Sequence, residues 1–318
     1  MGELTWGTPL FFDLWMAGMA GGAYFAAFLI HLFGADEEKR LLKLATYIGV
    51  PLVLLGVLAI IIDLGEPLRA FNIYVGLRPW SWQVVSGGGA ASLRAWPPSV
   101  TFHLTSPMSL GGWILVIFSV AGVALIALWL AESAESPEQR GGFLGWVADI
   151  LRPLVPATKA LTWIGFVFAI LLMAYTGVVL SASSQTLWQA TFLVPPLFVA
   201  SATSTGLAAL MIALQLTGAR ERAAVMAQLR KALTVLVIVQ LVVLVGFLLW
   251  LSVAGVVGPL ISGTLGLFFW VGVVLLGLLI PLGLEFSALR GRAVLASPAL
   301  VLLGGLVLRA VVVIGGQM

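Results

Sequence analysis

Eight apolar stretches, each long enough to cross a bilayer, constrain this chain more than any other feature. A helix that spans the hydrocarbon core needs about 20 mostly apolar residues. Because lipid offers no partners for backbone N–H and C=O groups, such stretches fold as helices. The sequence therefore predicts an all-α, polytopic integral membrane protein. Its expected spans are residues 10–33, 44–63, 109–131, 160–182, 191–216, 233–257, 263–284 and 297–315.

The loops between these spans predict the orientation of the protein. The loops after the first, third, fifth and seventh spans carry most of the Lys and Arg residues, while the opposite side has only Arg69, Arg78 and Arg94. Since cytoplasmic loops carry an excess of Lys and Arg, both termini are expected outside. The net charge of +3 follows from those cytoplasmic loops and does not indicate a nucleic-acid partner.

The spans divide into two expected four-helix bundles. The first comprises residues 1–182 and includes a long outer loop, 64–108; the second comprises residues 191–318. Residues 22–34 and 206–218 share a small-residue start and a closing glycine, and their spans run in the same direction. This echo fits two halves related about the membrane normal. A chance match between helices rich in small residues is the alternative.

Four polar side chains from four spans are expected in the outer leaflet: Asp13, Asp63, Tyr175 and Arg309. An ionisable group at membrane depth is costly and indicates function when it faces a cavity or a partner. An acid, a phenol and a base at one depth supply the hydrogen bonds and protons that a quinone needs. Alternatively, Arg309 is an ion-pair partner of Asp63 or Asp13, Asp13 is hydrated, and Tyr175 is a core aromatic.

Three further polar residues, His31, Gln240 and Glu285, lie near the cytoplasmic ends of spans one, six and seven. They are candidates for a proton path toward the outer pocket, and solvated helix ends are the alternative. The chain has no Cys and only two His, on opposite sides of the membrane, so it offers no iron–sulfur ligands and no bis-His haem site. No motif for another metal is present.

Four stretches resemble the NrfD/PsrC family, the membrane subunits of polysulfide reductase-like complexes. They are AGMAGGA at 17–23, DLGEPLR at 63–69, YTGVVLS at 175–181 and PPLFVASATSTG at 195–206. The second and third stretches are the more specific ones. The resemblance covers nearly the whole chain.

This resemblance implies a haem-free, quinone-reactive subunit in a bacterial or archaeal cytoplasmic (inner) membrane, which is not an enzyme alone. Menaquinone or ubiquinone would exchange electrons near the outer face with an extrinsic ferredoxin-type iron–sulfur subunit. That subunit is often joined to a molybdenum or tungsten bis-pterin subunit. The direction of electron flow is not implied, because relatives can also oxidise quinols, and proton translocation is a further possibility.

The same resemblance assigns roles by motif position. Tyr175 corresponds to the quinone-site tyrosine, Asp63 and Arg69 to an outer acidic–basic pair, and Asp13 to a polar quinone contact. Together with Arg309 from the depth argument, these residues form the expected quinone site, with Asp13, Asp63 and Tyr175 as its catalytic groups. Two alternatives remain: a secondary transporter or ion-translocating subunit that couples through Arg309 and Asp63, and a purely structural anchor.

Overall fold

The computed structural model describes residues 8–33, 39–63, 75–76, 99–100, 107–133, 150, 152–217, 223–286 and 295–318. Within these residues, eight helical segments have the length and apolar composition needed to cross a membrane. The prediction of an all-α, multi-pass membrane protein is therefore confirmed.

The eight spans consist of the following elements, in chain order. The first four are α1 (Thr8–Phe33), α2 (Lys39–Asp63), α3 (Pro107–Ser133) and α5 (Thr158–Ser181), which the 3-10 turn η4 (Arg152–Ala157) precedes. The fifth and sixth are α7 (Val194–Leu216) and α8 (Ala223–Val253), and the eighth is α12 (Ala296–Gly315). The seventh is one continuous helix made of α10 (Gly263–Leu267), the π-helix η6 (Phe268–Leu279) and α11 (Ile280–Phe286). Two short helices, α6 (Thr186–Gln189) and α9 (Gly258–Ile261), lie between spans, and β1 (Val75–Gly76) pairs with β2 (Ser99–Val100).

The largest difference from the predicted boundaries is at α8, which begins at Ala223 and not near residue 233. The additional turns contain Ala, Met, Gln, Leu, Arg and Lys, all of which favour helix. Apolarity marks where a helix enters the membrane, but it does not mark where the helix itself begins.

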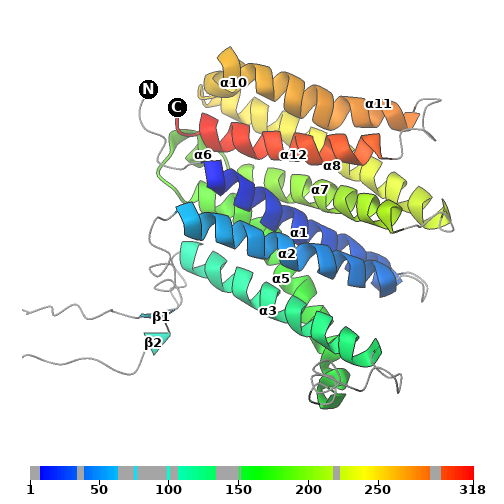
Figure 1. Ribbon diagram of the computed structural model, residues 1–318. Coiled ribbons are helices and arrows are strands. Elements are labelled where there is room, and N and C mark those ends of the chain that lie inside the picture. The colour runs from blue at the N-terminus through cyan, green and yellow to red at the C-terminus, as the bar shows by residue number, and fades with distance from the viewer. Residues whose placement is uncertain are drawn as a thin grey trace, which may run out of the picture.

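Helices α1 and α7 lie in the middle of the molecule (Figure 1). Both contact α5 and α12 as well as each other; α2 packs against α1, and α8 against α7. The start of α1 and the end of α12 lie at the same end of the bundle, as an even number of spans requires (Figure 1). That this end faces outward stays a prediction.

The contact between α1 and α7 depends on two glycines. A Cβ atom on Gly22 would collide with the carbonyl group of Ala202, and one on Gly206 would collide with the backbone at Gly22 and Ala23. These small residues therefore permit the close approach of the two helices. Gly22 and Gly206 are also the matched first residues of the predicted internal echo. The division into two bundles stays a prediction.

Candidate functional site

Arg309 is fully buried, with 0% of its surface exposed. It lies on α12 and reaches two other helices: Nε donates to the Leu14 carbonyl of α1 at 3.0 Å, and Nη1 donates to Ser201 Oγ of α7 at 3.0 Å. Nη1 also donates to the carbonyl of Gly305, one turn earlier on α12, at 3.1 Å. The guanidinium carbon lies 5.3 Å from the ring centroid of Phe198.

One nitrogen of this guanidinium, Nη2, has no hydrogen-bond partner within the described residues. A buried donor without a partner costs free energy, more so when it is charged. The backbone leaves it little room, since a Cβ atom on Gly18 would lie 2.6 Å from Nη2. Three hydrogen bonds therefore hold Arg309, while its unpartnered Nη2 lies beside Gly18 of α1.

Asp13, on α1, is also buried, with 1% of its surface exposed. The interpretation of Asp13 as a hydrated surface group is wrong, because α2 covers it: a Cβ atom on Gly56 would lie 2.6 Å from Oδ1. That oxygen has no hydrogen-bond partner among the residues that the structure describes. Nor do Asp13 and Arg309 form an ion pair there, so this part of the ion-pair alternative is not observed.

The two groups nevertheless meet the same turn of α1. Asp13 directly precedes Leu14, whose carbonyl binds Arg309. Trp15, the next residue, is half-buried, and its indole Nε1 is a third buried polar atom without a partner in the described part of the chain. Sequence reasoning did not single out Trp15, because the sequence does not show that its neighbour Asp13 is buried.

Tyr175 lies on α5 and is half-buried. Its ring packs onto Gly111 of α3, where the ring occupies the space that a Cβ atom would need. Met173, two residues earlier, contacts Gly21 of α1, so Tyr175 lies about 3 Å further along α5 toward the predicted outer face. The structure thus places Tyr175 against α3, whereas Arg309 and Asp13 lie along α1.

The remaining predicted quinone-site residues are not fully described. Asp63 is the last residue of α2, and its side chain lies outside the described part of the structure. Arg69 lies outside the described residues altogether. A single cavity that joins these groups to Asp13, Tyr175 and Arg309 therefore stays a prediction.

The three candidates for a proton path lie in different surroundings. Gln240 of α8 is buried, and its Oε1 accepts a hydrogen bond from Ser204 Oγ of α7 at 2.6 Å. Glu285 of α11 accepts from Arg230 Nε of α8 at 3.2 Å. His31, at the far end of α1, is half-buried, and its ring centroid lies 6.4 Å from that of Phe28.

This arrangement concentrates acid and donor groups in an otherwise apolar interior. A carboxyl oxygen, an indole N–H and a guanidinium N–H, all buried and unpartnered among the described residues, belong to or lie near residues 13–18 of α1. Asp13 meets α2 at Gly56, whereas the guanidinium approaches α1 from α12 at Gly18. Buried polar atoms of native proteins nearly always have partners, so a group of exceptions calls for an explanation such as a ligand or water. The set offers hydrogen-bond donors and one carboxyl group that can exchange a proton.

Comparison with known proteins identifies the family. A family model described as "Polysulphide reductase, NrfD" matches residues 1–318. The chain is 29% identical to Protein NrfD of Escherichia coli (strain K12) in an alignment 334 residues long, which covers 99% of this chain and 96% of the relative. It is 25% identical to the C chain of polysulfide reductase from Wolinella succinogenes, covering 99% and 95% of the two proteins.

A shorter match, 26% identical over 83 residues, is to the C subunit of selenate reductase from Mesobacillus selenatarsenatis and covers 25% of this chain and 20% of that protein. The family match, in contrast, extends over every span described above. The chain belongs to the NrfD family and is a multi-pass protein of the inner membrane.

Proposed function

We propose that this chain is the haem-free membrane subunit of a respiratory oxidoreductase complex, and that it exchanges electrons between an extrinsic iron–sulfur subunit and a membrane quinone. Family membership supports the anchor role, since two similar proteins are named as the C components of polysulfide reductase and selenate reductase. The terminal substrate would react at the catalytic partner, which is expected to be a molybdenum or tungsten bis-pterin subunit.

The observation that carries the quinone assignment is the pair of unpartnered buried atoms of the described residues, Asp13 Oδ1 and Arg309 Nη2, at one turn of α1. A bound quinone takes up two electrons and two protons to become a quinol. Arg309 Nη2 is a donor suited to a quinone oxygen, and Asp13 is a carboxyl group suited to exchange a proton with one. The apolar walls of the surrounding helices suit the ring and its hydrocarbon tail.

Tyr175, Asp63 and Arg69 complete the proposed site on the strength of their motif positions. Tyr175 offers a phenolic O–H from α5, and Asp63 ends α2 on the side where α1 begins. In this proposal Tyr175 positions one oxygen of the ring, while Asp63 and Arg69 are assigned to the outer side of the site by their motif positions.

The first test uses the whole complex, purified through this chain, and a fluorescent quinone analogue, 2-heptyl-4-hydroxyquinoline N-oxide. We expect Arg309→Gln and Tyr175→Phe to weaken analogue binding about tenfold or more, because each removes a donor worth about 1.4 kcal/mol or more in a buried site. Quinone turnover should fall in both variants, while the iron–sulfur subunit still co-purifies.

Arg40→Gln is the matched control, because Arg40 is an exposed arginine at the opposite end of α2. Unchanged analogue binding in both site variants would overturn the proposed site. The transporter alternative predicts solute or ion movement by the chain alone in proteoliposomes, without partners. Interrupted helices at the midplane would favour it, but α8 runs without a break over 31 residues.

A further inference from the structure

A row of buried polar side chains extends along α7, α8, α11 and α12 from the predicted cytoplasmic end to Arg309. We propose that this row, termed the polar row and made of Glu285, Ser297, Gln240, Ser204 and Ser201, takes up protons from the cytoplasm for the quinone site. The inference rests on the proposed function, and it assigns the source of the protons that quinone reduction consumes.

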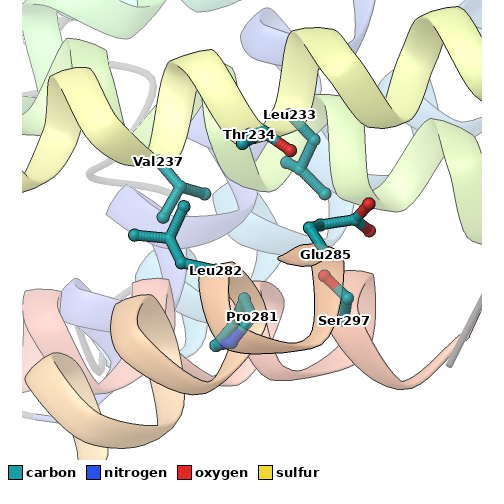
Figure 2. A pocket seen from close by; sticks show the side chains of 7 residues that line it. All are labelled: Leu233, Thr234, Val237, Pro281, Leu282, Glu285 and Ser297. Atoms are coloured by element: carbon teal, nitrogen blue, oxygen red, sulfur yellow. The ribbon is translucent and has the colours of Figure 1, made fainter. Parts of the chain in front are cut away.

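The row begins at a narrow hollow between α8, α11 and α12 (Figure 2). Thr234, Glu285 and Ser297, from three different helices, line it. Ser297 is 1% exposed, and its hydroxyl has no hydrogen-bond partner in the described residues. The hollow is too narrow for a water molecule in this conformation. A water molecule that satisfied the hydroxyl and carried protons inward would therefore enter only when the surrounding helices move apart.

Arg230 of α8 forms an ion pair with Glu285, one of the residues that line this hollow. Its Nε donates to Glu285 Oε1 at 3.2 Å, and both side chains are mostly buried, with 13% and 7% of their surfaces exposed. The pair keeps Glu285 in the wall of the hollow, close to the cytoplasmic end of α11. Glu285 can thus pass a proton between bulk water and the hollow.

The middle of the row is a set of hydrogen bonds between α7 and α8. Ser204 Oγ lies 2.6 Å from Gln240 Oε1 and 3.0 Å from the Ser201 carbonyl, and all three residues are buried. Ser201 Oγ in turn accepts from Arg309 Nη1 at 3.0 Å. Polar groups of neighbouring residues therefore lead from Gln240 to Arg309, and from there to Leu14, beside Asp13. The step from the Ser201 carbonyl to the Ser201 hydroxyl passes through one residue and is not itself a hydrogen bond.

One apolar step separates the hollow from Gln240. Thr234 and Gln240 are six residues apart on α8, which corresponds to about 9 Å. Val237 and Leu282 line the hollow on this side (Figure 2). A short apolar constriction of this kind conducts only when water enters it, so it keeps the row closed between turnovers.

Arg309 couples proton entry along the row to the charge at the quinone site. Its buried positive charge opposes the entry of an excess proton from Gln240, because charges interact strongly in a medium of low polarity. A negative charge beside the guanidinium, such as the one that arriving electrons bring, removes this opposition. Electrons and protons then arrive together: two electrons from the iron–sulfur subunit and two protons from cytoplasmic water convert one quinone to one quinol.

The test uses the whole complex in proteoliposomes containing 2,3-dimethyl-1,4-naphthoquinone, with the pH indicator pyranine trapped in the lumen. A reduced, membrane-impermeant sulfonated viologen, added outside, drives only complexes whose outer face points outward. Valinomycin with potassium prevents a voltage from building up. We expect the lumen of wild-type vesicles to lose two protons per quinone reduced.

Gln240→Leu should reduce this lumenal proton loss at least tenfold per quinone, and Ser297→Ala should slow it. Gln240→Glu, which keeps an oxygen in the row, should retain most of it. Gln215→Leu is the matched control, because Gln215 also lies on α7 but is eleven residues beyond Ser204 and outside the row. Co-purification of the iron–sulfur subunit and binding of the quinone analogue verify that each variant is folded.

The outcomes separate the two proposals. Wild-type complex that reduces no quinone overturns the proposed function. Normal quinone reduction with no lumenal alkalinisation in wild type, or with undiminished alkalinisation in Gln240→Leu, overturns the polar row and leaves the quinone site standing. Loss of alkalinisation in Gln240→Leu but not in Gln215→Leu supports it.

Discussion

The end of α1 and the start of α5 differ in kind from α7, α8 and α11, although all of these helices share one bundle. In the first region, aromatic rings fill the space: Phe28 stacks on Phe166 with centroids 4.2 Å apart and meets Trp163 edge-on at 4.9 Å. In the second region, the polar row replaces such rings with hydrogen-bonded side chains.

With the polar row as the proposed proton route, one bundle would combine that route with a sealed region. Tyr24, one turn before Phe28 on α1, packs edge-on against Phe118 of α3 with ring centroids 5.7 Å apart, and its hydroxyl donates to the Thr162 carbonyl at 3.1 Å. His31 lies next to Phe28, so aromatic side chains follow it along α1 toward the outer side. We therefore assign the seal to this aromatic cluster (Tyr24, Phe28, Trp163 and Phe166) and the proton route to the polar row.

The largest effect is expected at the contact that joins the two regions. Gly22→Ala places a Cβ atom against the Ala202 carbonyl, where only backbone movement could relieve the clash. Overpacking typically costs about 1–3 kcal/mol, and a clash with rigid backbone should exceed that range. We expect little folded protein in the membrane fraction, measured by fluorescence-detected size exclusion of a tagged chain.

Gly283→Ala is the control for this substitution, because no atom lies within 4 Å of the Cβ that it would add. It should be neutral or slightly stabilising, since alanine favours helix over glycine. If Gly22→Ala folded as well as Gly283→Ala, the two regions would not depend on a close contact between α1 and α7.

A smaller effect is expected from opening the aromatic cluster. Phe28→Ala removes a side chain that is 2% exposed and should destabilise the protein by about 3–5 kcal/mol, the usual cost of such a cavity. Because the cavity is apolar, we expect it to stay dry and lumenal proton uptake per quinone to stay at the wild-type value. Thermal unfolding in detergent and the pyranine assay measure the two quantities.

A higher proton leak in the Phe28→Ala vesicles before any donor is added would show that the aromatic cluster is a barrier. Loss of uptake with no leak would contradict the comparison, because it would assign the proton route to the first region.

The spans were predictable from sequence, whereas the partners of the polar residues were not. Apolar length identifies a membrane helix because lipid forces each segment to satisfy its own backbone. Arg309 was also detectable, as a charge in an apolar stretch. Its partners Ser201 and Leu14 lie 108 and 295 residues away along the chain, and only the packing of α1, α7 and α12 brings them together.

The burial of Asp13 was missed for the same reason. Its depth along α1 suggested access to water, but Gly56 of α2 lets that helix cover the carboxyl group. The depth of a residue in the membrane follows from the sequence of its own helix. Whether its side chain is buried depends on how a neighbouring helix packs against it. The same limit explains why Trp15 was not singled out.

The smallest structural effect, with the sharpest consequence, is expected at Ser204. Ser204→Ala removes one hydroxyl and its hydrogen bond to Gln240, so the loss of stability should be only about 1 kcal/mol. Lumenal proton uptake per quinone should nevertheless fall several-fold, because the substitution breaks the polar row between Gln240 and Ser201. Thr203→Ala, on the same helix, is the matched control: its hydroxyl bonds carbonyl groups of its own helix, those of Val199 and Ala200. Equal uptake in the two variants would mean that the hydrogen bonds of α7 serve packing alone. The comparison would be established by two results together: a stable Ser204→Ala protein with reduced lumenal proton uptake per quinone, and a destabilised Phe28→Ala protein with normal uptake. The polar row would then serve proton uptake, and the aromatic cluster would serve packing.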